Sequence, residues 1–166
     1  MHVIYAGQPF SKGDGPSIFL AGPTPRSNKA KSWRPAAIKI LVRGGYDGLI
    51  FVPESCDHKV QTGYVDNLEW ETKGLTLAKV ILFWIPREMH HMPALTTNVE
   101  WGMWYNSGKV VLGAPAEAVK ISYLEWHGNR FGIERQYTLE NTIDEALDLL
   151  EDKYGFNLPL CAEVGK

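Results

Sequence analysis

Residues 79–85 read KVILFWI, an apolar run that suits a strand buried on both faces of a parallel sheet. Three further runs rich in Ile, Val, Leu and Phe accompany it in the sequence: SIFLA at 17–21, GLIFV at 48–52 and KVVLG at 109–113. Stretches with helical character lie between these runs, at 30–43, 64–77 and 97–107. This alternation predicts an α/β fold with a doubly wound, mainly parallel sheet.

The carboxyl-terminal third has one clear signal. Thr142 and Glu145 match a capping box ahead of an amphipathic stretch, which predicts a helix that ends near Tyr154, where Gly155 stops it. Two weaker signals precede this helix: a helical pattern in APAEAVKISYLEW (114–126) and an edge-strand pattern in GIERQYTL (132–139).

The composition is that of a globular protein with a substantial core, since 45% of the 166 residues are hydrophobic and 22% are charged. We expect one domain over residues 1–166, in which the glycine-rich residues 1–16 form a loose amino-terminal arm or a hairpin. A net charge of -2 disfavours a nucleic-acid polymer as partner. Cys56 and Cys161 lack metal-ligand spacing, and no run approaches the roughly 20 apolar residues of a membrane span, so we expect a reducing, cytoplasmic location away from membranes.

Ligands of an open parallel sheet bind beyond the carboxyl ends of its strands, where the following loops gather. The loops concerned are GPTPR (22–26), PESCD (53–57) and residues 86–97. Pro23 and Pro25 remove amide donors, and the G-x-G-x-x-G series is missing, so a dinucleotide site is not expected. His90 and His91 are adjacent and lack a carboxylate at ligand spacing, so a metal site is not expected either.

Glu100 is the leading candidate for catalysis. In the segment TTNVEWG, Thr97 or Asn98 can cap a helix that has Glu100 in its first turn. The helix dipole would then stabilise the carboxylate by roughly 0.3–1 kcal/mol and keep it ionised as a nucleophile. Taken alone, the position favours an acid that only stabilises the start of the helix, and the spacing by itself does not identify an enzyme.

Two neighbouring features each admit two interpretations. Glu71, at the end of the acidic segment DNLEWE, could face the same cleft as the second carboxyl group of a glycosidic reaction, or belong to a solvated helix face. Trp101, Trp104 and Tyr105 make the helix around Glu100 apolar nearly all round, which indicates packing against the core or against another subunit.

A set of short motifs follows in order along the chain: IFLAGPTPR, SWRPAAIKIL, FVPE, a segment with Tyr64, Trp70 and Glu71, FWIPREMHHMPALTTNVEWG and SGKVVLGAPAEAVKISYL. In order and spacing the set resembles the nucleoside 2-deoxyribosyltransferase-like family over residues 17–124. The resemblance implies a flavodoxin-like or Rossmann-like three-layer sandwich with a mainly parallel sheet of about five strands. It also implies a homo-oligomer with the site near a subunit interface, and no cofactor.

The same resemblance implies cleavage of the N-glycosidic bond of a 2'-deoxyribonucleoside and transfer of the sugar to another nucleobase. Glu100 matches the family's catalytic glutamate, which attacks C1' and forms a covalent deoxyribosyl intermediate. Phe19 stands where better-known members have a tyrosine that orients this glutamate, Glu71 lies one position from one base-contacting acid, and Ala94 replaces a second. The expected site therefore comprises Glu100 and Glu71 as catalytic residues, with Phe19, Gly22, Pro23, Thr24, Glu54, Arg87 and Asn98 around the substrate.

Alternatives remain for the reaction. Water in place of the second base would make the protein an N-glycosidase that uses the same glutamate, and the outcome depends on how well the pocket excludes water. Arg26, Arg34 or Arg87 could bind the 5'-phosphate of a nucleotide. Glu71, Glu54, a histidine of the 90–91 pair or a neighbouring subunit could protonate the leaving base. A non-catalytic nucleotide-binding module would keep the fold without the activity.

Overall fold

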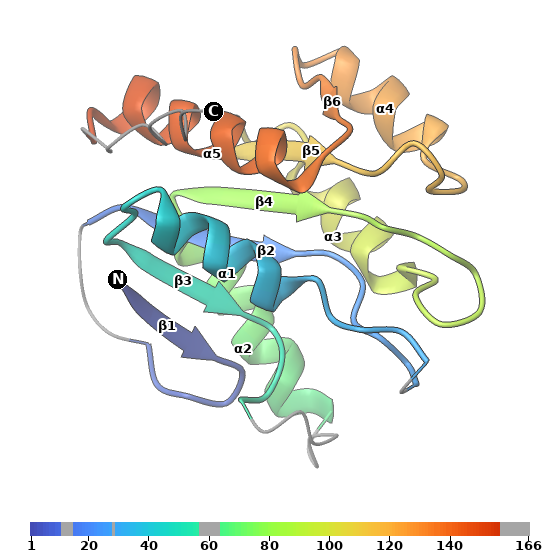
Figure 1. Cartoon of the computed structure of the whole chain (residues 1–166), viewed down its shortest axis with the longest axis horizontal. Helices are drawn as coiled ribbons and strands as arrows, with labels where there is room; N and C mark the ends of the chain where they lie inside the picture. Colours follow the sequence, from blue (N-terminus) through green and yellow to red (C-terminus); the bar gives the residue numbers. More distant parts are fainter. Residues whose placement is uncertain (11–14, 28, 57–63, 157–166) are drawn as a thin grey trace, which may run out of the picture.

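The computed structural model describes residues 1–10, 15–27, 29–56 and 64–156. These residues form a central six-stranded, all-parallel sheet in the order β1-β3-β2-β4-β5-β6 (Figure 1). The strands are β1 (His2–Tyr5), β2 (Ser17–Ala21), β3 (Leu49–Val52), β4 (Val80–Trp84), β5 (Val110–Gly113) and β6 (Arg135–Gln136). The predicted flavodoxin-like α/β fold is confirmed, and the sheet has six strands where about five were expected.

Within the described ranges, five helices cover the two faces of this sheet: α1 (Arg34–Arg43), α2 (Tyr64–Leu77), α3 (Leu95–Trp104), α4 (Ser122–Asn129) and α5 (Leu139–Tyr154). Helices α1 and α5 pack on one face, and α2, α3 and α4 contribute to the core on the other (Figure 1). Successive side chains of a strand point to opposite faces. In β4, Ile81 and Phe83 therefore join one core while Leu82 and Trp84 join the other, which explains why this run is apolar at every position.

Residues 2–5 differ from the expected arm or hairpin. They form the edge strand β1, which pairs in parallel with β3, from His2 opposite Leu49 to Tyr5 opposite Val52. Ile4 is buried in the core and holds this short strand in place. Strand β2 lies on the far side of β3, so β1 and β2 do not form a hairpin.

The last helix begins four residues before the predicted capping box. Thr138 is the N-cap residue of α5, and its side chain accepts a hydrogen bond of 3.1 Å from the backbone N–H of Asn141. Thr142 is buried inside the helix and its hydroxyl donates to the carbonyl of Thr138 at 2.7 Å, so the predicted cap at Thr142 with Glu145 is wrong. The predicted end is confirmed, because Gly155 takes a left-handed conformation with φ 66° at the C-cap.

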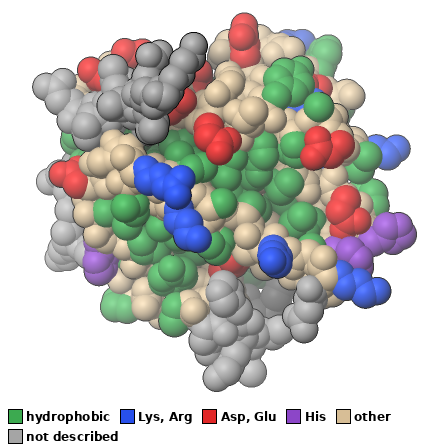
Figure 2. Space-filling view, in the orientation of Figure 1, with side chains coloured by type: hydrophobic (Ala, Val, Ile, Leu, Met, Phe, Trp, Pro, Cys, Tyr) green, Lys and Arg blue, Asp and Glu red, His purple; other side chains and the backbone are tan. Residues whose placement is uncertain are grey.

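On the face seen in Figure 2, acidic and basic side chains lie among apolar and other side chains. None of the described helices is both long and apolar enough to cross a lipid bilayer.

Candidate active site

A cavity of about 470 Å³ lies at the carboxyl ends of the strands, beside the loops that follow β2 and β4. Neighbouring strands β2 and β4 lead to α1 on one face and to α3 on the other, so the loops that follow them diverge and leave a crevice. The described lining residues are Gly22, Pro23, Thr24, Pro25, Arg26, Arg34, Pro53, Asn67, Leu68, Glu71, Pro93, Ala94, Leu95, Thr96, Thr97 and Glu100.

The loop after β2 forms one wall and requires a glycine. Gly22 has φ 148°, and a Cβ added there would lie 2.1 Å from the carbonyl oxygen of Trp84 at the end of β4. The indole of Trp33 donates to the Pro23 carbonyl at 3.2 Å, which fixes the next residue of the loop. Glycine thus lets the loop run against the end of the neighbouring strand.

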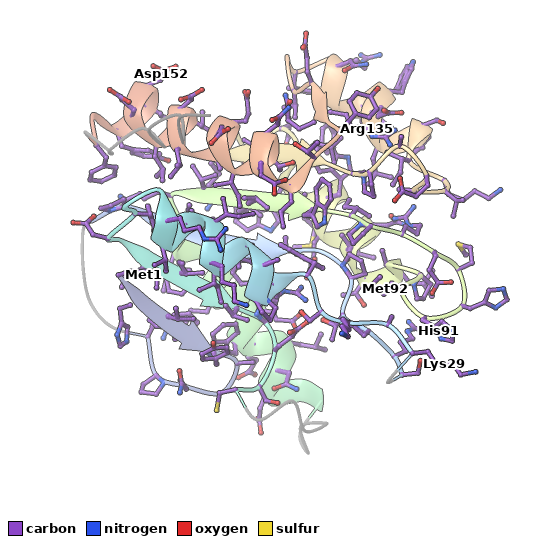
Figure 3. The ribbon with its side chains drawn as sticks, in the orientation of Figure 1. Met1, Lys29, His91, Met92, Arg135 and Asp152 are labelled. Carbon is purple, nitrogen blue, oxygen red and sulfur yellow. The ribbon has the colours of Figure 1, made fainter. Side chains whose placement is uncertain are left out.

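The loops after β2 and β4 also contact each other. The backbone N–H of Arg26 donates to the carbonyl of His91 at 2.9 Å, and the hydroxyl of Ser27 lies 3.0 Å from Nδ1 of His91. Figure 3 shows His91 and Met92 at this edge of the molecule, near Lys29 of the preceding loop. His90 and His91 are not among the described residues that line the cavity.

Helix α3 starts earlier than the sequence suggested. Its N-cap is Ala94, in a left-handed conformation with φ 56° and without a side-chain cap, rather than Thr97 or Asn98. Because the helix begins at Leu95, Glu100 falls in its second turn, where the effect of the dipole has largely decayed. The first turn itself, from Leu95 to Thr97, lines the cavity beside Glu100.

Glu100 and Glu71 bring two electrostatically coupled carboxyl groups into the cavity from α3 and α2. Burial and the negative charge of Glu71 raise the pKa of Glu100 to about 7, while Arg34 acts in the opposite direction. Burial likewise raises the pKa of Glu71, again opposed by Arg34. The expectation that the helix dipole keeps Glu100 ionised is therefore wrong. Near neutral pH the pair can hold one proton, so that one group is a carboxylate and the other a carboxylic acid.

Arg34 extends from the start of α1 into the wall of the cavity. Its Nη1 forms an ion pair of 2.5 Å with Glu54, and its Nη2 donates to the carbonyl of Gly22 at 2.7 Å. From the sequence, Arg34 was expected only as a possible phosphate ligand. Pro35 in the first turn of α1 was the available signal, because proline favours a helix start and so places Arg34 at the carboxyl edge of the sheet.

The structure brings together five of the residues predicted for the site, since Glu100, Glu71, Gly22, Pro23 and Thr24 all line the cavity. The other predicted residues do not line it.

The other predicted residues lie in the core, behind the cavity wall or in contact with one another. Phe19 is fully buried in β2, with its ring centroid 6.3 Å from that of Trp70. Glu54 lies behind the wall as the partner of Arg34. Arg87 donates to the side chain of Asn98 and, at 2.7 Å, to the carbonyl of Lys120. Of the three arginines considered for a phosphate, Arg26 and Arg34 line the cavity and Arg87 does not.

Within the part of the chain that the structure describes, no group of three or more His, Cys, Asp or Glu side chains is arranged to hold a metal ion. The described lining of the cavity includes the carboxyl groups of Glu71 and Glu100 and the buried guanidinium of Arg34.

A search of the curated proteins gave no match. The family model described as nucleoside 2-deoxyribosyltransferase like matches residues 15–118, which include β2, α1, α2, β4, α3 and every described residue of the cavity wall. The match spans more than half of the 166 residues. The chain belongs to the nucleoside 2-deoxyribosyltransferase-like family.

Proposed function

We propose that this protein transfers the 2'-deoxyribosyl group of a nucleoside from one nucleobase to another, with Glu100 as nucleophile and Glu71 as proton donor and acceptor. The observation that carries the proposal is that two carboxyl groups with raised pKa values line one cavity in a chain of this family. The cavity volume of about 470 Å³ is within the range of roughly 300–1,000 Å³ that is usual for small-molecule sites.

The proposed reaction consists of two displacements at C1' of the sugar. In the first, the one proton that the pair shares lies on Glu71, and a carboxylate oxygen of Glu100 forms a bond to C1' while the C1'–N bond breaks. The released electron pair stays on the base, which takes that proton from Glu71. In the second, a nitrogen of the incoming base attacks C1', the sugar–Glu100 bond breaks, and the proton lost by that nitrogen returns to Glu71. Two inversions leave the configuration at C1' unchanged, and no cofactor is needed.

Transfer rather than hydrolysis requires that water be kept from the covalent intermediate. Leu95 lines the cavity, yet its side chain is 56% exposed. Val99 and Met103, which follow Leu95 along α3, are 63% and 61% exposed, so the three side chains form an exposed apolar stripe. A second copy of the chain that covers this apolar stripe would shield the cavity, so the proposal includes a homo-oligomer with the site near a subunit interface.

The test is to incubate the pure protein with a panel of deoxyribonucleosides and ribonucleosides, with and without a second base, and to separate the products by chromatography. New nucleosides support transfer. Free base and free sugar alone would identify an N-glycosidase, and binding without turnover of any substrate would identify a non-catalytic module. Intact-protein mass spectrometry should detect a deoxyribosyl adduct on Glu100.

Variants assign the two carboxyl groups. Glu100→Ala should lower turnover by at least about 1,000-fold, because the nucleophile is removed. Glu71→Gln should lower it by about 100-fold or more, because an amide cannot exchange the proton. Glu69→Gln is the matched control, since Glu69 is an exposed residue of the same helix as Glu71, and it should retain full activity. Full turnover in Glu100→Ala would refute the mechanism.

A further inference from the structure

The burial of Arg34 carries an unusually large free-energy cost for a residue that is not one of the two reacting glutamates. Its side chain is 1% exposed, and it is the largest fully buried side chain among the described residues. Taking a guanidinium out of water costs several kcal/mol unless charge and hydrogen bonds compensate for the loss. The surroundings of this side chain therefore indicate what it is held there to do.

Four of the five N–H groups of Arg34 are used within the protein. Nε donates to the carbonyl of Leu20 at 3.0 Å, and Nη1 donates to Glu54 at 2.5 Å and to the hydroxyl of Thr24 at 3.1 Å. Nη2 donates to the carbonyl of Gly22 at 2.7 Å. The second N–H of Nη2 has no acceptor among the residues that the structure describes, although Arg34 lines the cavity.

Glu54 is the ion-pair partner of the guanidinium. It accepts a hydrogen bond of 2.9 Å from the hydroxyl of Ser32 and is not among the described lining residues. Among the described lining residues, the ionisable side chains are Arg26, Arg34, Glu71 and Glu100. Arg26 is exposed, so solvent screens its charge, whereas the buried charge of Arg34 acts on its neighbours with little screening.

We propose, as an extension of the function proposed above, that Arg34 is a positioning residue for the reaction: it ties the Gly22–Thr24 loop to the cavity wall and places a fixed positive charge beside Glu71 and Glu100, so that one of them stays ionised. Without that charge, burial would favour the neutral form of both carboxyl groups, and no nucleophile would remain near neutral pH. Arg34 thus acts through the two glutamates and through the loop.

The direction of the electrostatic effect is the same for both glutamates. Arg34 lowers the pKa of Glu71 and of Glu100 against the effect of burial. Replacing Arg34 by methionine, which has a similar reach and no charge, should therefore raise both pKa values. Lysine at the same position keeps the charge and loses the planar fork, so it should leave the pKa values nearly unchanged while loosening the loop.

The experiment compares Arg34→Met, Arg34→Lys and the wild-type protein by carbon NMR titration of the glutamate carboxyl groups, together with the pH profile of kcat/KM. In Arg34→Met we expect the titrations of Glu71 and Glu100, and the acid limb of the profile, to move up by about one pH unit or more. Arg34→Lys should restore both close to the wild-type position. Arg43→Met, at the exposed far end of the same helix, is the matched control and should change neither.

A second variant covers the case in which Arg34→Met does not fold. Glu54→Gln keeps Arg34 but removes the anion that neutralises it, so the two glutamate titrations should move down in pH, opposite to Arg34→Met. Unchanged titrations in both folded variants, or in Glu54→Gln alone if Arg34→Met is unfolded, would overturn the proposal. The titrations need no substrate, so a protein without turnover would refute the proposed function, whereas an active transferase with unshifted titrations would refute only the role of Arg34.

Discussion

Glu100 shows how a residue suited to chemistry can weaken the fold around it. Its pKa is about 7 in the folded protein, against an ordinary value of 4.5. Between these two pH values the folded state binds the proton more tightly than the unfolded chain does, so the free energy of unfolding falls as the pH rises. Above pH 7 the buried charge therefore costs the folded state up to about 3 kcal/mol.

This cost predicts the effect of Glu100→Gln on stability. The neutral amide has nearly the same shape, so the variant should be more stable than the wild type at pH 8, by up to about 3 kcal/mol. The gain should shrink as the pH falls below 7 and disappear near pH 4.5. Urea denaturation at a series of pH values measures it, with Glu69→Gln as the exposed control. A gain that stays constant over this pH range would show that Glu100 is not desolvated.

The sequence could identify Glu100 but not its protonation state. The segment TTNVEWG and the family resemblance together point to this acid, whereas its position near the start of a helix did not single it out. The pKa depends first on burial and then on Glu71 and Arg34, which come from two other helices, and no local pattern reports that proximity. Arg87 and Asn98 were misplaced for the same reason, because they bond to each other away from the cavity.

At the scale of elements, apolar runs located the central strands well because these strands are buried on both faces. Every residue of β2, β4 and β5 is buried, so sequence and environment agree position by position. The edge strand β1 was missed because only Ile4 of its four residues is buried. The start of α3 was missed because left-handed Ala94 precedes it, a conformation that the local sequence does not favour.

The start of α5 offers a test of capping. Thr138→Ala should lower the free energy of unfolding by about 1 kcal/mol, because the N–H of Asn141 loses its acceptor. Glu145→Ala should change it by less than about 0.5 kcal/mol, since Glu145 is an exposed residue within the helix and not part of a cap. Chemical denaturation of both variants at pH 7 measures the difference. The reverse order of the two effects would restore the capping box at Thr142.

At the scale of the whole molecule, the alternation of strands and helices predicted the layers, and the layers place the site. Strand β2 lies inside the sheet, with β3 on one side and β4 on the other. Strands β2 and β4 are therefore neighbours, while the helices that follow them, α1 and α3, cover opposite faces (Figure 1). Glu71 and Glu100 both come from the face that carries α2 and α3, whereas Arg34 reaches the cavity from α1 on the opposite face. The cavity thus combines carboxyl groups from one layer with a cation from the other.

The exposed apolar side chains of α3 allow a prediction about assembly, a property of the whole molecule. We expect the protein to form a homo-oligomer through the apolar stripe of α3, in which Val99 and Met103 are 63% and 61% exposed. Val99→Glu should shift the protein towards monomers in light scattering, because a buried interface does not tolerate an unpaired charge. Val42→Glu is the matched control, since Val42 is 53% exposed on α1, and it should not change the assembly.

The Val99→Glu variant also tests whether assembly affects the reaction. Leu95 belongs both to the stripe and to the cavity wall, so separating the subunits should open the cavity to water. In Val99→Glu the ratio of hydrolysis to transfer should therefore rise several-fold, while Val42→Glu keeps the ratio of the wild type. A wild-type protein that is monomeric and still transfers sugar without hydrolysis would show that one chain alone excludes water, and that the stripe on α3 has no part in the reaction.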